Sequence, residues 1–218
     1  MSLLTVFAIA ATMCDRAPTI ELPAFNASDR FAVMVTGDGG WRRIDAKVTD
    51  DLRGNGIPIV GFIASSYFQK RRTPEESACA LAQLIRTYRE RWHKERVILI
   101  GYSRGADALP FMINRLPPDV RASVQLTVLL GLEPRIDFEY HPYWTLAHYI
   151  QHAPQYEVLP EVQKLRGQNV LCVYGEREKD TLCRKLDPTQ FKIVREPGGH
   201  HFAGRYSAVG EAILNAAH

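Results

Sequence analysis

A serine flanked by glycines is the residue of this chain best placed to act as a nucleophile. Ser103 is the centre of the run Gly-Tyr-Ser-Arg-Gly at positions 101–105. An apolar run, Val-Ile-Leu-Ile at 97–100, precedes the motif, and a helix-compatible stretch follows it. A G-x-S-x-G motif between strand and helix predicts a sharp turn that lifts the serine hydroxyl above the sheet edge. The same turn aims the backbone N–H of Arg104 at a developing oxyanion.

A serine hydroxyl needs an imidazole as its base and a carboxylate that orients the imidazole. After such a motif the acid and then the histidine are expected further along the chain. The sequence Pro-Gly-Gly-His-His-Phe at 197–202 follows a predicted strand at 191–194. We expect His200 to be the base, because the glycines before it allow the backbone to turn sharply toward the serine. His201 is the alternative.

Three carboxylates compete for the role of the acid in the segment after the predicted strand at 170–174. They are Glu176, Glu178 and Asp180. Asp180 is preferred, because an aspartate followed by a short apolar turn is the usual form of this loop. Glu178 is the alternative, although a solvated loop of mixed charge would also account for Glu176 and Glu178.

A glycine-rich segment, Thr-Gly-Asp-Gly-Gly-Trp at 36–41, follows the predicted strand at 31–35. Glycines permit a close approach of backbone to substrate. The backbone N–H of Gly39, or that of Gly40, is predicted to be the second oxyanion donor beside Arg104. A phosphate-binding loop is disfavoured, because the segment lacks a G-x-G-x-x-G pattern and a GK[ST] ending.

Strands and helices must alternate to position these residues. Strands are expected at 31–35, 57–63, 97–100, 126–130, 170–174 and 191–194, and helices at 44–52, 73–92, from the serine motif to 116, and 206–216. This alternation predicts an α/β fold with a mostly parallel sheet and helices on both faces. The stretch 133–161, rich in His, Tyr and Pro, interrupts the alternation and is expected to form a small cap over the pocket.

The composition fits one globular domain of 218 residues, 46% of them hydrophobic and 23% charged. A net charge of +3 with scattered basic residues argues against direct binding of nucleic acid. No cysteine or histidine spacing indicates a metal site, and no cofactor is expected. Residues 1–24 are predicted to be an N-terminal extension whose apolar start resembles a secretory signal without its positive charge. A buried N-terminal strand is the alternative, and residues 25–218 form the single domain.

The four cysteines are expected to differ in state. Cys172 and Cys183 bracket the loop of the predicted acid and could form a disulfide that braces it in an oxidising compartment. Cys79 lies on a predicted helix and is expected to be a buried free thiol. Cys14 lies near the N-terminus, and no partner is assigned to it.

Four segments together resemble the VirJ family of bacterial virulence proteins, which includes the C-terminal domain of AcvB. They lie at 36–41, 101–107, 174–183 and 197–202. The resemblance extends from about residue 31 to the C-terminus. It implies an α/β-hydrolase-type fold and export to the periplasm of Gram-negative bacteria. One branch of the family hydrolyses the aminoacyl ester of lysyl-phosphatidylglycerol, and another is tied to type IV secretion of DNA and proteins.

By matching position, the resemblance assigns the triad roles to Ser103, Asp180 and His200. The segment at 101–107 ends in the family's Gly-Ala-Asp string. The resemblance implies that its aspartate, Asp107, either orients the helix after the serine or holds a cationic substrate head. Trp41, at the end of the glycine-rich segment, is also predicted to contact substrate.

Arg104 departs from the family pattern, in which an aromatic residue is expected after the serine. Its guanidinium could pair with Asp107, three residues along the helix, or could face the phosphate of an anionic lipid. The same charge could disfavour a lysyl cation. Substrate identity is therefore the part of the resemblance that this residue affects most.

The predicted reaction is hydrolysis of an ester through an acyl-enzyme, with an aminoacylated phospholipid at a membrane surface, or another ester, as substrate. For lysyl-phosphatidylglycerol, lysine is the acyl part and a glycerol hydroxyl of the lipid is the leaving group. Two alternatives are a general carboxylesterase for small soluble esters and a non-catalytic periplasmic accessory protein. In the second case components of a type IV secretion system would be the partners.

Overall fold

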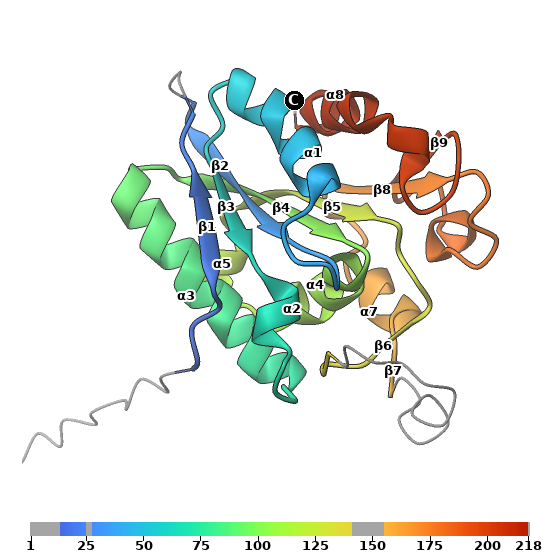
Figure 1. Ribbon diagram of the computed structural model, residues 1–218. Coiled ribbons are helices and arrows are strands. Elements are labelled where there is room, and N and C mark those ends of the chain that lie inside the picture. The colour runs from blue at the N-terminus through green and yellow to red at the C-terminus, as the bar shows by residue number, and fades with distance from the viewer. Residues whose placement is uncertain (1–13, 25–27, 141–154, 218) are drawn as a thin grey trace, which may run out of the picture.

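One sheet runs through the whole fold. A computed structural model describes residues 14–24, 28–140 and 155–217. In these residues the sheet has seven strands in the order β1-β3-β2-β4-β5-β8-β9 (Figure 1). The strands are β1 (Thr19–Leu22), β2 (Arg30–Val35), β3 (Ile59–Phe62), β4 (Arg96–Tyr102), β5 (Val124–Leu130), β8 (Val170–Gly175) and β9 (Lys192–Glu196). Strand β1 runs antiparallel to β3, and all other neighbours in the sheet are parallel.

Helices cover both faces of this sheet (Figure 1). They are α1 (Arg43–Gly54), α2 (Ala64–Tyr67), α3 (Pro74–Trp92), α4 (Arg104–Asn114), α5 (Pro118–Arg121), α7 (Leu159–Gln163) and α8 (Tyr206–Ala216), with 3-10 turns η1 (Leu182–Lys185) and η2 (Phe202–Gly204). Helices α1 and α8 pack together on one face, and α3 and α4 pack together on the other. The mostly parallel α/β architecture predicted from the sequence is therefore confirmed.

Alternation along the strands supplies a core to each face. In β2, Phe31, Val33 and Val35 belong to the core beneath α3 and α4. Ala32 and Met34 belong to the core beneath α1 and α8. Successive side chains of a strand point to opposite faces, so a central strand covered on both faces must be apolar throughout.

The parallel direction of the strands determines where the site forms. The loops after β2, β4, β5, β8 and β9 all leave the sheet at the carboxyl ends of the strands. This edge is where open α/β sheets bind ligands. Each segment predicted to carry chemistry follows one of these strands, so the topology brings segments distant in sequence to a single edge.

The predicted cap is only partly described. Its beginning and end pair as a two-stranded sheet, β6 (Arg135–Ile136) with β7 (Tyr156–Glu157). Residues 141–154 lie outside the described residues, and so does the apolar segment 1–13. Among the described residues, no helix combines the length and apolar composition that crossing a bilayer requires.

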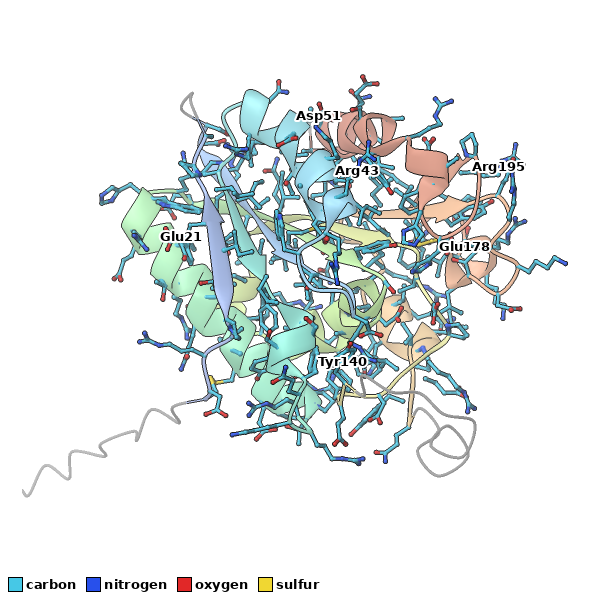
Figure 2. The ribbon with its side chains drawn as sticks, viewed as in Figure 1. Glu21, Arg43, Asp51, Tyr140, Glu178 and Arg195 are labelled. Atoms are coloured by element: carbon cyan, nitrogen blue, oxygen red, sulfur yellow. A yellow bond between two sulfur atoms is a disulfide. The ribbon has the colours of Figure 1, made fainter. Side chains whose placement is uncertain are left out.

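The N-terminal boundary differs from the prediction. Strand β1 lies within residues 1–24, which were predicted to be an extension, yet it forms the edge of the main sheet. Cys79 is not a free thiol, because it forms a disulfide with Cys14 and ties the start of the described chain to α3. The predicted bridge between Cys172 and Cys183 is present, and it joins β8 to η1 (Figure 2).

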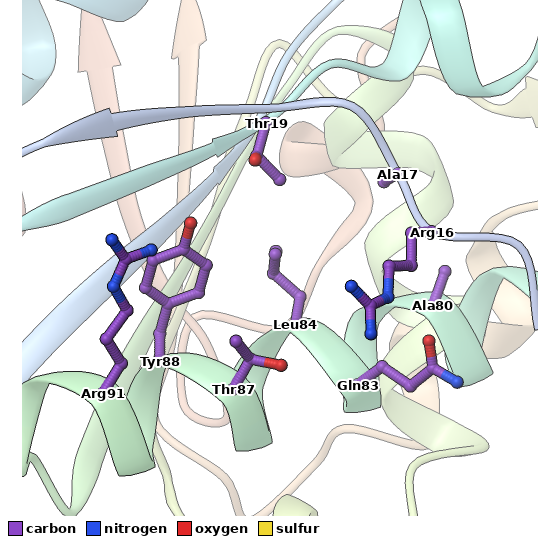
Figure 3. A pocket seen from close by; sticks show the side chains of 9 residues that line it. All are labelled: Arg16, Ala17, Thr19, Ala80, Gln83, Leu84, Thr87, Tyr88 and Arg91. Atoms are coloured by element: carbon purple, nitrogen blue, oxygen red, sulfur yellow. The ribbon is translucent and has the colours of Figure 1, made fainter.

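A cavity of ≈ 220 Å³ lies between the segment before β1 and helix α3 (Figure 3). It is lined by Arg16, Ala17, Thr19, Ala80, Gln83, Leu84, Thr87, Tyr88 and Arg91. The Arg91 guanidinium is paired with Glu21, which also accepts a hydrogen bond from the Tyr88 hydroxyl. None of the residues predicted to do chemistry lines this cavity.

The two disulfides are expected to have different effects on stability and activity. The two cysteines of Cys14–Cys79 are 65 residues apart in the sequence, and those of Cys172–Cys183 are 11 residues apart. Loop-closure entropy assigns about 4 kcal/mol to the longer loop and about 3 kcal/mol to the shorter one. Replacing Cys14 and Cys79 by alanine should lower the free energy of unfolding in urea and leave unchanged the ester turnover that the sequence predicts. Replacing Cys172 and Cys183 should lower both, because that bridge braces the loop after β8. Identical urea midpoints with and without reductant would contradict this prediction.

Candidate active site

The backbone at Ser103 has the strained geometry expected of a nucleophile turn. Ser103 lies between β4 and α4 with φ 53° and ψ −123°. A non-glycine residue at such a positive φ costs about 1–3 kcal/mol and persists only where the surrounding structure enforces it. Here the Ser103 N–H donates to the Leu130 carbonyl at 2.9 Å. The serine is half-buried at the edge of the sheet.

The two flanking glycines are required by close backbone contacts. A Cβ at Gly101 would lie 2.4 Å from the carbonyl oxygen of Gly105. A Cβ at Gly105 would lie 2.1 Å from the carbonyl oxygen of Val35. Both distances are far below van der Waals contact, so helix α4 can begin directly after Ser103 only without side chains at these positions. The prediction of a G-x-S-x-G turn is confirmed in its geometry.

His200 is oriented by a carboxylate, but that carboxylate is not the predicted one. The Nδ1 atom of His200 lies 2.7 Å from Oε1 of Glu178. The second oxygen of Glu178 accepts the Gly175 N–H at 2.6 Å. Glu178 is only 12% exposed in its side chain, whereas Asp180 is exposed to solvent (Figure 2 labels Glu178). The structure thus pairs His200 with the alternative, Glu178, and not with the preferred residue, Asp180.

The reason for this correction is the spacing from the end of β8. Glu178 is three residues beyond Gly175, the last residue of the strand, so its carboxylate can fold back on the strand's own N–H and still reach His200. This three-residue spacing is the sequence signal that would have identified the acid. Asp180 instead leads into Thr181, whose hydroxyl donates to the Leu132 carbonyl at 2.9 Å.

The ion pair changes the basicity of His200. The hydrogen bond to Glu178 raises the pKa of His200 above the ordinary histidine value. Burial alone would lower this pKa, but its effect is smaller. The negative charges of Glu178 and Glu133 raise the pKa further. An imidazole of raised pKa is a stronger base, and the proton held on Nδ1 leaves Nε2 as the atom that can accept one.

The last residue of β5 and the three residues after it contact every part of the site. Leu130 accepts the Ser103 N–H, and a Cβ at Gly131 would lie only 2.7 Å from Cε1 of His200. The Leu132 carbonyl accepts a hydrogen bond from the Thr181 hydroxyl in the loop after β8. The Glu133 N–H donates to the carboxylate of Asp107 in α4 at 2.8 Å. Ser103, His200 and the loop that carries Glu178 therefore border one short stretch of backbone.

The Ser103 hydroxyl is not hydrogen-bonded to either imidazole in the part of the chain that the structure describes. His200 is paired through Nδ1 with Glu178, and His201 through Nδ1 with the Tyr102 hydroxyl at 2.8 Å. Hydrogen bonds between nucleophile and base are often long in free enzymes and shorten when substrate binds. His201 thus has a structural contact, with a tyrosine whose pKa burial raises.

The glycine-rich segment lies beside the nucleophile. A Cβ at Gly37 would lie 3.2 Å from Cβ of Ser103. Gly40 closes a turn by donating its N–H to the Gly37 carbonyl at 3.1 Å, so that N–H is already used. Of the two predicted donors, Gly39 is therefore the one whose N–H has no acceptor among the described residues. The Asp38 N–H, next to the contact with Ser103, is a further candidate that the sequence analysis missed.

The two residues predicted to contact substrate both have contacts within the protein. Asp107 is 4% exposed and its carboxylate accepts the Glu133 N–H, so it orients the loop after β5. Burial raises the pKa of Asp107 well above its ordinary value. The Trp41 ring packs on β3, where a Cβ at Gly61 would lie 2.7 Å from its Cζ3 atom.

Arg104 also has a different partner from the predicted ones. Its guanidinium pairs with Asp38 of the glycine-rich segment, not with Asp107. The side chain is 8% exposed, so its charge does not face solvent or a lipid phosphate. Among the described residues, no group of three or more His, Cys, Asp or Glu side chains is arranged to hold a metal ion.

Comparison with protein families identifies the chain. The family model described as "Bacterial virulence protein (VirJ)" matches residues 29–218. The chain belongs to the VirJ family. The matched residues of this VirJ-family chain include Ser103, Glu178 and His200. A search of curated proteins found no match.

Solved structures similar to this VirJ-family chain establish its fold as that of the α/β hydrolases. Est1E from Butyrivibrio proteoclasticus is 14% identical with a TM-score of 0.63, over 91% of this chain and 93% of that one. MenH from S. aureus is 11% identical with a TM-score of 0.65, over 91% and 98% of the two chains. XC6422 from Xanthomonas campestris, described as a serine hydrolase without lid, is 14% identical with a TM-score of 0.57, over 92% and 93%.

Proposed function

We propose that this VirJ-family chain is a serine ester hydrolase that uses Ser103 as nucleophile, His200 as base and Glu178 as the orienting acid. The observation that carries the proposal is the pairing of His200 with Glu178 at 2.7 Å on the sheet edge where Ser103 occupies its strained turn. A purely structural histidine would not require a serine at positive φ on the same edge of the sheet. Conversely, a serine held in a strained turn becomes a good nucleophile only if a base can take its proton.

The proposed reaction proceeds through an acyl-enzyme. His200 Nε2 removes the Ser103 proton as Oγ attacks the ester carbonyl, and the alcohol leaves with that proton. Water then attacks the acyl group, with His200 again as base, and free acid is released. The backbone N–H of Arg104, together with that of Gly39 or Asp38, would stabilise the oxyanion in both steps.

The proposed substrate is the aminoacyl ester of lysyl-phosphatidylglycerol. Pairing of Arg104 with Asp38 supports this choice, because a neutralised guanidinium does not repel a lysyl cation. The exposed Glu133 carboxylate, whose charge acts on His200, supplies a negative potential near the acyl position. Both features favour a cationic acyl group over a neutral one.

The proposed location is the periplasm. Two disulfides are consistent with an exported protein, because such bonds persist in oxidising compartments. Lysyl-phosphatidylglycerol at a membrane surface would then be the substrate encountered there. Partners from a type IV secretion system belong to the same proposal.

A phosphonate probe tests the serine chemistry without any assumption about substrate. Incubation of the full chain with a fluorophosphonate, followed by mass mapping, should place the label on Ser103 alone. Addition of lysyl-phosphatidylglycerol vesicles should slow labelling and release lysine, whereas phosphatidylglycerol vesicles should do neither. Labelling of another serine, or none, would reject the proposed nucleophile. Labelling without lysine release would leave an esterase with another substrate.

A further inference from the structure

The buried guanidinium next to the nucleophile requires an explanation. Arg104 is the first residue of α4 and only 8% exposed. Burying a charged side chain is costly unless its charge is paired and its donors are hydrogen-bonded. Such a residue is expected to have specific partners, and the identity of those partners indicates its role.

The partners of Arg104 lie on two segments distant from it in sequence. Its Nε and Nη2 atoms donate to the two carboxylate oxygens of Asp38, the second at 3.2 Å. Its Nη1 atom donates to the carbonyls of Asp137 and Glu139, the latter at 3.3 Å. The fork geometry uses the planar guanidinium fully, as a lysine could not.

These contacts join the two sources of the proposed oxyanion donors. One donor is the backbone N–H of Arg104 itself, and the other belongs to the turn that contains Asp38. That turn approaches the nucleophile closely, since a Cβ at Gly37 would lie 3.2 Å from Cβ of Ser103. The glycine-rich segment has little side-chain packing of its own at Gly37, Gly39 and Gly40. An ion pair at Asp38 is therefore well placed to keep the turn in position.

We propose that Arg104 is a positioning residue whose pairing with Asp38 holds the glycine-rich turn at a set distance from Ser103, so that both oxyanion donors are in place before substrate binds. This inference rests on the proposed function. Preorganised donors stabilise the charge that develops in the transition state and contribute little to ground-state binding. Arg104 also holds residues 137–139, which belong to the predicted cap, beside the turn at Ser103.

The test compares variants of the pair with a control at an exposed ion pair. Arg104→Gln and Asp38→Asn should each lower kcat on a short-chain p-nitrophenyl ester by about 30- to 100-fold, with KM changed less than about threefold. Arg104→Lys should recover only a small part of the loss, because a point charge cannot span both carboxylate oxygens. The control is Arg86→Gln, which removes the exposed fork on Asp119 and should leave kcat unchanged.

A double variant and an exchange measurement separate positioning from general damage. The Asp38→Asn and Arg104→Gln changes combined should be no worse than the stronger single change, because both remove one interaction. Hydrogen exchange of the amides at 37–40 should be faster in each variant, while exchange in the β4 and β5 core should match the unmodified chain. Losses that multiply in the double variant, or a kcat within twofold of the unmodified chain, would overturn the inference.

Failure of the proposed function gives a different result. If a fluorophosphonate does not label Ser103 in the unmodified chain, the serine chemistry is wrong. The rate of hydrogen exchange of the amides at 37–40 in the Arg104→Gln variant still decides whether Arg104 holds the turn. If the unmodified chain is labelled and the Arg104→Gln chain is labelled at the same rate, with unchanged exchange, then only the positioning role is rejected.

Discussion

Replacement of Ser103 by alanine is expected to lower turnover of lysyl-phosphatidylglycerol by about 10⁴-fold or more. Without the hydroxyl no acyl-enzyme forms, and His200 and the oxyanion donors can only assist direct attack by water. Folding should be unaffected, because the hydroxyl has no hydrogen bond to any described residue that its loss would leave unpaired. The measurement is lysine release from vesicles by the purified variant, with its thermal unfolding recorded beside it.

A matched control for this change is Ser207→Ala, which removes an exposed hydroxyl from α8. It should retain full turnover. Turnover kept by the Ser103→Ala protein would contradict the proposed mechanism. If that protein also restored secretion in a secretion-defective strain, the chain would act as an accessory protein whose serine is dispensable.

Replacement of Glu178 by glutamine is expected to lower kcat by about 10²- to 10⁴-fold, while Asp180→Asn should stay within about twofold of the unmodified chain. A glutamine keeps the size of the side chain but cannot stabilise the imidazolium that forms when His200 accepts the serine proton. Asp180 is exposed and does not contact His200, so its charge contributes little. The measurement is kcat on a p-nitrophenyl ester for both variants at several pH values.

The pH dependence should change with the same substitution. Only neutral His200 can act as base, so activity falls as the pH drops through its pKa. The hydrogen bond to Glu178 raises that pKa, so the acidic limb of kcat/KM should lie above the ordinary histidine range. In the Glu178→Gln variant the limb should move to lower pH. An unmoved limb, or an equal loss in Asp180→Asn, would contradict the assignment of the acid.

Stability should respond to the same pair with a defined sign. A histidine whose pKa is raised by folding stabilises the folded state below its unfolded pKa, and this contribution is lost as the pH rises through the folded pKa. The Glu178→Gln variant should therefore lose more stability in urea at pH 5.5 than at pH 8.5. A loss independent of pH would indicate altered packing in place of a lost ion pair.

The strands and the nucleophile turn are visible in the sequence because local patterns specify them. Continuous apolar runs such as that of β4 indicate a strand covered on both faces. The G-x-S-x-G pattern indicates the turn, in which Gly101 allows the backbone of α4 to come close and Gly105 allows α4 to approach Val35 of β2. Strand β1 is less visible. It has four residues of alternating exposure at the sheet edge, a pattern too short to separate from an extended tail.

The amino-acid sequence alone thus predicted the α/β fold and the turn at Ser103 and singled out His200, since the pattern behind each of these predictions lies in a short stretch of the chain. The tertiary structure decided the partners. Glu178 and not Asp180 meets His200, Asp38 and not Asp107 meets Arg104, and Cys14 meets Cys79. The physical reason is that the partner of a side chain depends on where a second segment of the chain returns to the sheet edge. The carboxylates of Glu176, Glu178 and Asp180 look equivalent in the sequence until the loop of His200 is in place beside them.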